Sequence, residues 1–115
     1  MSTRATIHFQ HSNEQDEAII YRHCDGYPEG LGKDLQSFFA DVQAQTKDTR
    51  FNDPSYLAAK FVVWQAGEYT KEPKRLPLDF LSLGAVKEDP GDIEYRYLVK
   101  CKGSTVPEVK CEEVN

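Results

Sequence analysis

The sequence of 115 residues is 39% hydrophobic and 29% charged, a length and composition typical of one globular domain. Aromatic residues make up 11% of it, which argues against intrinsic disorder. Lys and Arg number 14 against 19 Asp and Glu, and the net charge of −5 argues against binding to the phosphate backbone of a nucleic acid. No apolar run approaches the about 20 residues of a membrane-spanning helix, and residues 1–10 lack the apolar segment of a signal peptide.

The three cysteines, Cys24, Cys101 and Cys111, form no CxxC motif and have no zinc-finger spacing to a histidine. His23 and Cys24 are adjacent, so on a strand they point to opposite faces and do not bind one ion together. An odd number of cysteines without such a motif indicates free thiols. We therefore expect a cytoplasmic protein without a metal ion or other cofactor.

The N-terminal part of the chain predicts a β-hairpin. Apolar and polar residues alternate along residues 4–10, as in a strand with one buried face. The apolar face comprises Ala5, Ile7 and Phe9, and the polar face comprises Thr6, His8 and Gln10. Residues 17–23 form a second strand, rich in β-branched and aromatic side chains, which we expect in the centre of the sheet. The polar segment 11–16 is the turn between them, and His8 and His11 are expected to lie exposed.

Two helices are predicted to follow the hairpin. The first begins after a turn at residues 25–30, and its apolar residues recur on one face at helical spacing. These residues are Leu31, Leu35, Phe38, Phe39 and Val42. A polar stretch at residues 46–52 ends this helix, and Asp53 and Pro54 are typical of the N-cap and first position of the next. The second helix has the wider apolar face, so we expect it to pack closer to the sheet. Its deepest residues should include Phe61 and Trp64.

A loop with two prolines is predicted over residues 73–83, and a short strand over residues 81–86. A long strand over residues 93–101 and a final strand around residues 108–112 complete the chain. The predicted order is β-β-α-α-(β)-β-β. Because the helices are segregated from the strands, we expect a single α+β domain over residues 1–115, an antiparallel sheet with two helices packed on one face.

The pattern of the two last strands also predicts how they pair. The long strand is apolar at its odd-numbered positions, and directly opposed residues of an antiparallel pair point to the same side of the sheet. A three-residue loop between the strands therefore pairs Tyr97 with Cys111 and Val99 with Val109, with all four side chains facing the core. In this register Cys101 lies too far from Cys111 for a disulfide.

The segment 21–32 concentrates the residues that could bind a ligand. It leaves a strand, turns, and enters a helix whose first N–H groups attract a small anion. The candidate ligand-binding residues are Arg22, His23, Asp25, Tyr27 and Gly30. The segment contains neither a P-loop nor a dinucleotide-binding glycine pattern.

The same residue types are also typical of a turn and a helix start, and we favour this structural interpretation. In it, His23 closes the turn by a hydrogen bond to Asp25, and Asp25 also accepts one from residues 26–29 or from a nearby side chain. No nucleophile is marked beside His23, so no catalytic residue is predicted, and the sequence favours a protein that is not an enzyme.

The run Tyr21-Arg22-His23-Cys24-Asp25-Gly26-Tyr27-Pro28-Glu29-Gly30 resembles a Y-x-H-x-D-G-Y-P-E-G stretch. It is shared by small uncharacterised proteins that phages, prophages and bacteria encode. A late segment, Gly91–Tyr97, is similar to theirs as well. The resemblance implies a small intracellular protein and no particular activity, and Cys24 falls at the variable position of the motif.

Two functions from different classes remain open on this sequence. The first, which we favour, is a non-enzymatic interaction or accessory protein of phage origin, which binds a protein partner through a surface patch. The alternative is a small-ligand or nucleotide-binding protein that uses segment 21–32 to hold a small anionic ligand. A pocket beside His23 with converging polar groups would favour the alternative, and polar groups satisfied within the turn would favour the first.

Overall fold

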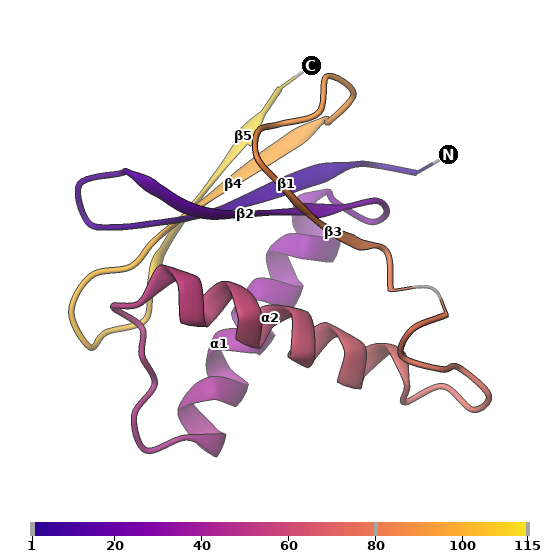
Figure 1. The fold of residues 1–115 in the computed structure, drawn as a ribbon, viewed down its shortest axis with the longest axis horizontal. Helices are drawn as coiled ribbons and strands as arrows, with labels where there is room; N and C mark the ends of the chain where they lie inside the picture. Colours follow the sequence, from indigo (N-terminus) through magenta and orange to yellow (C-terminus); the bar gives the residue numbers. More distant parts are fainter. Residues whose placement is uncertain (1, 80, 115) are drawn as a thin grey trace.

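The computed structural model describes residues 2–79 and 81–114 of the chain (Figure 1). Its elements in chain order are β1 (Ala5–Gln10), β2 (Asp16–Arg22), a π-helical turn (Pro28–Gly32), α1 (Lys33–Gln45), α2 (Pro54–Tyr69), β3 (Leu83–Val86), β4 (Tyr95–Lys100) and β5 (Glu108–Glu113). The prediction of an α+β domain is confirmed. The predicted loop over residues 73–83 contains residue 80, which lies outside the described residues, and the remainder of that segment up to β3 contains neither helix nor strand.

The five strands form one mixed sheet in the order β3-β2-β1-β4-β5. β1 pairs antiparallel with β2 but parallel with β4, so the prediction of a purely antiparallel sheet is wrong at this pair. Parallel neighbours need a long connection, and the chain between β1 and β4, which includes both helices, supplies it. β2 lies inside the sheet as expected, and β1 is the middle strand.

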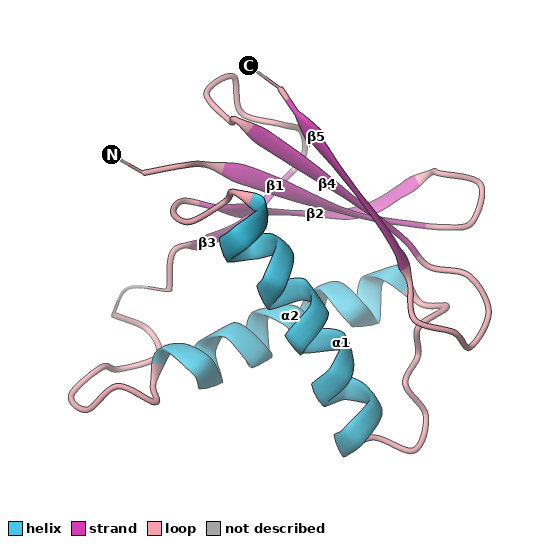
Figure 2. Ribbon diagram, turned by 180° about the vertical axis from the view of Figure 1, so that it is seen from behind, coloured by secondary structure: helices cyan, strands magenta, loops and turns pink. Residues whose placement is uncertain are grey.

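Both helices cover the same face of the sheet (Figure 2). α2 lies against β1 and β2, as its wider apolar face predicted. Phe61 is fully buried, with its ring centroid 6.4 Å from that of Phe9 on β1 and 5.3 Å from that of Phe38 on α1. Trp64 is only partly buried, so the prediction for the deepest residues of α2 holds for Phe61 and is wrong for Trp64.

The apolar stripe predicted for the first helix is buried throughout. Asp53 caps α2 as predicted, because its carboxylate accepts a hydrogen bond from the backbone N–H of Tyr56 at 3.2 Å. The connection between the helices is less polar than expected: Phe51 is buried, with its ring centroid 6.0 Å from that of Phe39. Neither helix of the described chain is long and apolar enough to cross a membrane.

β4 and β5 pair in the predicted register, with Tyr97 opposite Cys111 and Val99 opposite Val109. Cys101 and Cys111 are free thiols. The expected burial of the last strand is wrong, however, because Val109 and Cys111 are exposed. Both line an open groove beside the π-helical turn, together with Tyr97. The helices do not cover β5, and the apolar core therefore ends at β4.

The outward face of β1 is more buried than its polar side chains suggested. His8 is 7% exposed, not exposed as predicted, whereas His11 is exposed. The segment between β3 and β4 crosses in front of β1 and brings Asp89 onto this face (Figure 1). One oxygen of Asp89 accepts a hydrogen bond from Thr6 at 2.6 Å and lies 2.7 Å from Nε2 of His8. A loop distant in sequence thus covers polar groups that no helix covers.

Candidate functional site

The segment 21–32 lies where β2 ends and α1 begins, and its backbone is bonded to the rest of the fold. Asp25 has a φ of 55°, in the left-handed region, and its carbonyl accepts a hydrogen bond from the N–H of Leu31 at 2.8 Å. Gly26 donates its N–H to the carbonyl of Thr3 and accepts a hydrogen bond from the buried hydroxyl of Tyr97 at 2.7 Å. Burial raises the pKa of Tyr97, so this hydroxyl stays protonated and donates. These bonds tie the turn to Thr3, which precedes β1, to Tyr97 on β4, and to the π-helical turn that leads into α1.

Two glycines of the segment are required by packing. A Cβ atom on Gly26 would lie 2.7 Å from Cβ of Ala5, and one on Gly30 would lie 2.4 Å from the carbonyl oxygen of Asp25. Both distances are shorter than real carbon contacts, so any side chain would push the turn away from the sheet. The glycines serve close packing of backbone on backbone, which is a structural role.

Arg22 is held by protein groups on three sides. Its side chain is 8% exposed, and its Nε donates to the carbonyl of Cys24 at 2.9 Å. One terminal nitrogen donates to the carboxylate of Asp34 on α1 at 2.7 Å and to the side chain of Gln65 on α2 at 3.3 Å. This guanidinium connects the end of β2 to both helices.

The hydrogen bonds of the turn differ in part from those predicted. The ring of His23 pairs with the hydroxyl of Tyr21 at 2.8 Å, and a bond between His23 and Asp25 is not among those found in the described residues. Asp25 accepts its predicted hydrogen bond from a side chain, the hydroxyl of Tyr27, at 3.3 Å. The nearby carboxylate of Asp25 raises the pKa of Tyr27. These groups satisfy one another within the turn.

The five candidate residues do not converge on one pocket. Arg22 and Asp25 line a cleft of about 390 Å³ between the end of β2 and α2, together with Cys24. His23, Tyr27 and Gly30 do not line this cleft. Within residues 2–79 and 81–114, no three His, Cys, Asp or Glu side chains are grouped so that they could hold a metal ion.

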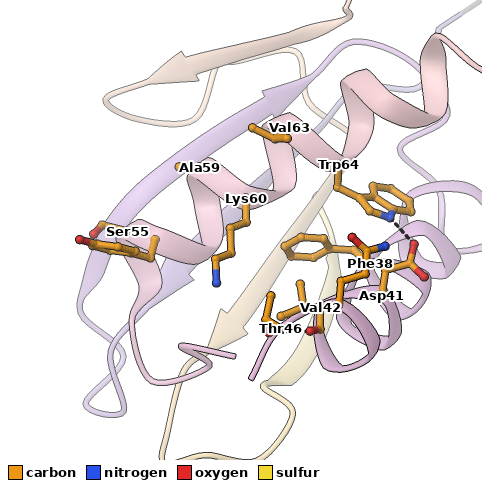
Figure 3. A pocket seen from close by; sticks show the side chains of 11 residues that line it. Phe38, Asp41, Val42, Thr46, Ser55, Ala59, Lys60, Val63 and Trp64 are labelled. Carbon is orange, nitrogen blue, oxygen red and sulfur yellow. Dashed lines mark hydrogen bonds between the residues drawn. The ribbon is translucent and has the colours of Figure 1, made fainter. Parts of the chain in front are cut away.

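A larger hollow lies between the C-terminal half of α1 and the first part of α2, and we call it the α1–α2 groove (Figure 3). Its volume is about 560 Å³. The lining residues are Phe38, Asp41, Val42, Gln45, Thr46, Ser55, Tyr56, Ala59, Lys60, Val63 and Trp64. Most of the lining surface is apolar, and two of these apolar side chains, Val63 and Tyr56, are 72% and 50% exposed.

The charged groups of the α1–α2 groove are engaged by the protein itself. The indole N–H of Trp64 donates to the carboxylate of Asp41 at 2.7 Å, shown as a dashed line in Figure 3. The ammonium of Lys60 donates to the carbonyl of Thr49 at 3.4 Å. One acidic and one basic side chain leave the groove without net charge, and its open surface suits an apolar occupant.

The sequence interpretation missed this groove because it assigned the apolar residues of α2 to a single core face. The signal was present in the run Phe61-Val62-Val63-Trp64, since four successive apolar residues surround a helix instead of forming one stripe. Such a helix either is buried on every side or leaves an apolar face open. In this fold Phe61 is buried in the core, and Val63 is mostly exposed at the rim of the open groove.

No protein-family model, curated protein or solved structure matches this chain. The geometry of the described residues is therefore the basis on which a function can be proposed.

Proposed function

We propose that the protein is a non-enzymatic binding module, which accepts an apolar helical segment of a partner protein in the α1–α2 groove. The observation that carries this proposal is the exposed apolar surface of the groove, with Val63 72% exposed at its rim. Contiguous apolar surface on a small protein typically marks an interaction site. An accessory role agrees with the resemblance of residues 21–30 to small phage, prophage and bacterial proteins.

The spacing of the lining residues supports a helical occupant. On each helix the residues that face the groove follow the spacing i, i+3, i+4, i+7. They are Phe38, Asp41, Val42 and Gln45 on α1, and Tyr56, Ala59, Lys60 and Val63 on α2. Two such stripes meeting at an angle form a trough, and an amphipathic helix laid into it buries its own apolar stripe. The small side chain of Ala59 leaves room for a close approach.

The neutrality of the groove supports the same choice of partner. Asp41 bonds to Trp64 and Lys60 to the backbone, and their opposite charges leave the groove without a net charge to attract a charged small molecule. The alternative, a small anionic ligand at segment 21–32, receives less support because Nε and one terminal nitrogen of Arg22 bond to Cys24, Asp34 and Gln65.

Native mass spectrometry of the protein purified from its host tests the proposal. We expect a retained partner protein with the wild-type chain, and its loss from Val63→Asp, which places a charge on the rim of the groove. Val106→Asp is the matched control, because Val106 is 43% exposed and does not line the groove. A partner retained by Val63→Asp contradicts the proposal, and a retained small anion that Arg22→Gln loses would favour the alternative.

Fluorescence supplies a second measurement on the purified complex. Trp64 is the single tryptophan of the chain and lines the α1–α2 groove, but it also lines the cleft beside Arg22 and Asp25. A change in its emission is therefore assigned to the groove only if Val63→Asp abolishes it. We expect the partner to shift Trp64 emission to shorter wavelength, because its helix excludes water from the indole. A partner that binds and leaves the emission unchanged occupies a different surface.

A further inference from the structure

β5 forms one edge of the sheet and is open along its length. Among residues 2–79 and 81–114 it pairs with β4 only, and five of its six residues are exposed. In Figure 1 it lies at the margin of the sheet and the helices lie below the other strands. We infer that β5 pairs antiparallel with β5 of a second copy of this chain, so that one sheet continues through a two-fold dimer. This surface is separate from the α1–α2 groove.

The backbone of β5 has free hydrogen-bonding groups in a defined alternation. The N–H of Val114 donates to the carbonyl of Glu94 at 2.8 Å, so position 114 bonds toward β4. Alternate residues of a strand bond to opposite sides, so every second residue before 114 also bonds toward β4. The residues whose N–H and C=O groups point to the open edge are therefore Val109, Cys111 and Glu113. These are the groups that a second strand would bond to.

The side chains on the outward face of β5 select a register. Glu108, Lys110 and Glu112 alternate in charge along this face. When the two-fold axis passes through Cys111, Lys110 lies opposite Glu112 of the second copy, and the same pair recurs on the other side of the axis. Moving the axis to Lys110 or to Glu112 places like charges opposite each other, which is destabilising.

Pro107 decides between the two registers that pair opposite charges. The second one has the axis at Val109 and places Glu108 opposite Lys110 of the other copy. It also places Pro107 opposite Cys111, at a position that should donate an N–H across the edge, and proline has none. With the axis at Cys111, Pro107 lies outside the paired segment 108–114. The geometry therefore favours the axis at Cys111.

Charge substitutions test the pairing. Analytical ultracentrifugation over a concentration series should show a dimer, and Lys110→Glu should weaken it about tenfold because both charge pairs become repulsive. Glu112→Lys should weaken it similarly. An equimolar mixture of the two variants should associate as well as the wild type, because the carboxylate introduced at position 110 of one chain then meets the ammonium introduced at position 112 of the other. Recovery of the dimer in the mixture also shows that both variants are folded. This control is needed because, within one chain, Glu112 already pairs with Arg96 at 3.3 Å and with Lys110 at 3.7 Å.

Cross-linking tests the register. In a Cys24→Ser background a short bismaleimide should join two copies through Cys111, whose Cα atoms would lie about 5.5 Å apart across the axis. In a Cys24→Ser, Cys111→Ser background, Val109→Cys should cross-link poorly, since the two sites lie about 13 Å apart along the strands at about 3.3 Å per residue. A monomer at all concentrations, a dimer that Lys110→Glu leaves unchanged, or preferential cross-linking at position 109 would each overturn the inference.

Discussion

The guanidinium of Arg22 and the carboxylate of Asp34 lie 2.7 Å apart, and this ion pair joins the end of β2 to the first turn of α1. Arg22 is nearly buried, whereas Asp34 is 39% exposed. The sequence made Arg22 a candidate ligand-binding residue while favouring a structural role for its segment, and the contacts of Arg22 agree with the structural role. Removing this ion pair should therefore lower the free energy of unfolding.

Asp34→Ala should lower the free energy of unfolding by about 1–2 kcal/mol. Removing one partner of a fully buried pair costs about 3–5 kcal/mol, and the partial exposure of Asp34 reduces this because water screens the charges. Urea denaturation measures the change. Asp48→Ala is the control, since that side chain is 80% exposed and its nearest cation lies 3.8 Å away. Equal stability of the two variants would show that the Arg22–Asp34 pair does not hold β2 to α1.

Phe61→Ala should lower the free energy of unfolding by about 3–5 kcal/mol, the cost of removing a large aromatic side chain from a packed core. Phe61 has no exposed surface and its ring contacts those of Phe9, Phe38 and Trp64. Val63→Ala on the same helix should change stability by less than about 0.5 kcal/mol, because Val63 is mostly exposed. Chemical denaturation of both variants measures these changes. A decrease in the free energy of unfolding below about 1 kcal/mol for Phe61→Ala would contradict the placement of Phe61 in the packed core.

Gly30→Ala and Gly67→Ala should act in opposite directions. The added Cβ at position 30 would meet the carbonyl oxygen of Asp25, so the turn must move, at a cost of about 1–3 kcal/mol. Position 67 lies in α2 with no atom within 4 Å of the added Cβ, and alanine there should stabilise the helix by about 0.5–1 kcal/mol. Differential scanning calorimetry measures the midpoint temperature of unfolding of each variant. If Gly30→Ala melts at or above the wild-type temperature, the close packing of the turn is refuted.

Asp89 should make the fold sensitive to acid. Burial alone would raise the pKa of its carboxyl, but hydrogen bonds from Thr6, His8 and Arg96 outweigh burial and hold the pKa below its ordinary value of 3.8. A carboxyl whose pKa is lower in the folded than in the unfolded protein contributes stability above the unfolded pKa. That contribution to stability is lost as the pH falls through the lower pKa that Asp89 has in the folded protein.

The wild-type chain should therefore lose more stability than Asp89→Asn between about pH 5 and pH 2. Urea denaturation at several pH values measures how the free energy of unfolding of each protein changes with pH. Asp92→Asn, in the same loop but with a side chain 57% exposed, serves as the control and should follow the wild type. Parallel curves for the wild type and Asp89→Asn would mean that the hydrogen bonds to Asp89 do not stabilise the folded state.

Local patterns in the sequence were sufficient for several elements of the fold. The alternation of residues 4–10 and 93–101, the apolar stripe that begins at Leu31 and the cap at Asp53 each depend on neighbours in the chain. The β4–β5 register could also be predicted, because residues joined by a short loop have few pairings that keep their apolar side chains on one face.

Contacts between distant segments decided the remaining features. Parallel and antiparallel strands share a period of two, so no local pattern indicates that β1 and β4 are parallel. The burial of His8 depends on Asp89, which lies 81 residues away. Likewise, the direction of the Arg22 side chain depends on the position of α1, and the α1–α2 groove exists only because two apolar helices meet at an angle. Residue types and their spacing indicate which side chains are able to bind, but whether they face a ligand, another part of the protein or solvent depends on the packing of segments far apart in the chain.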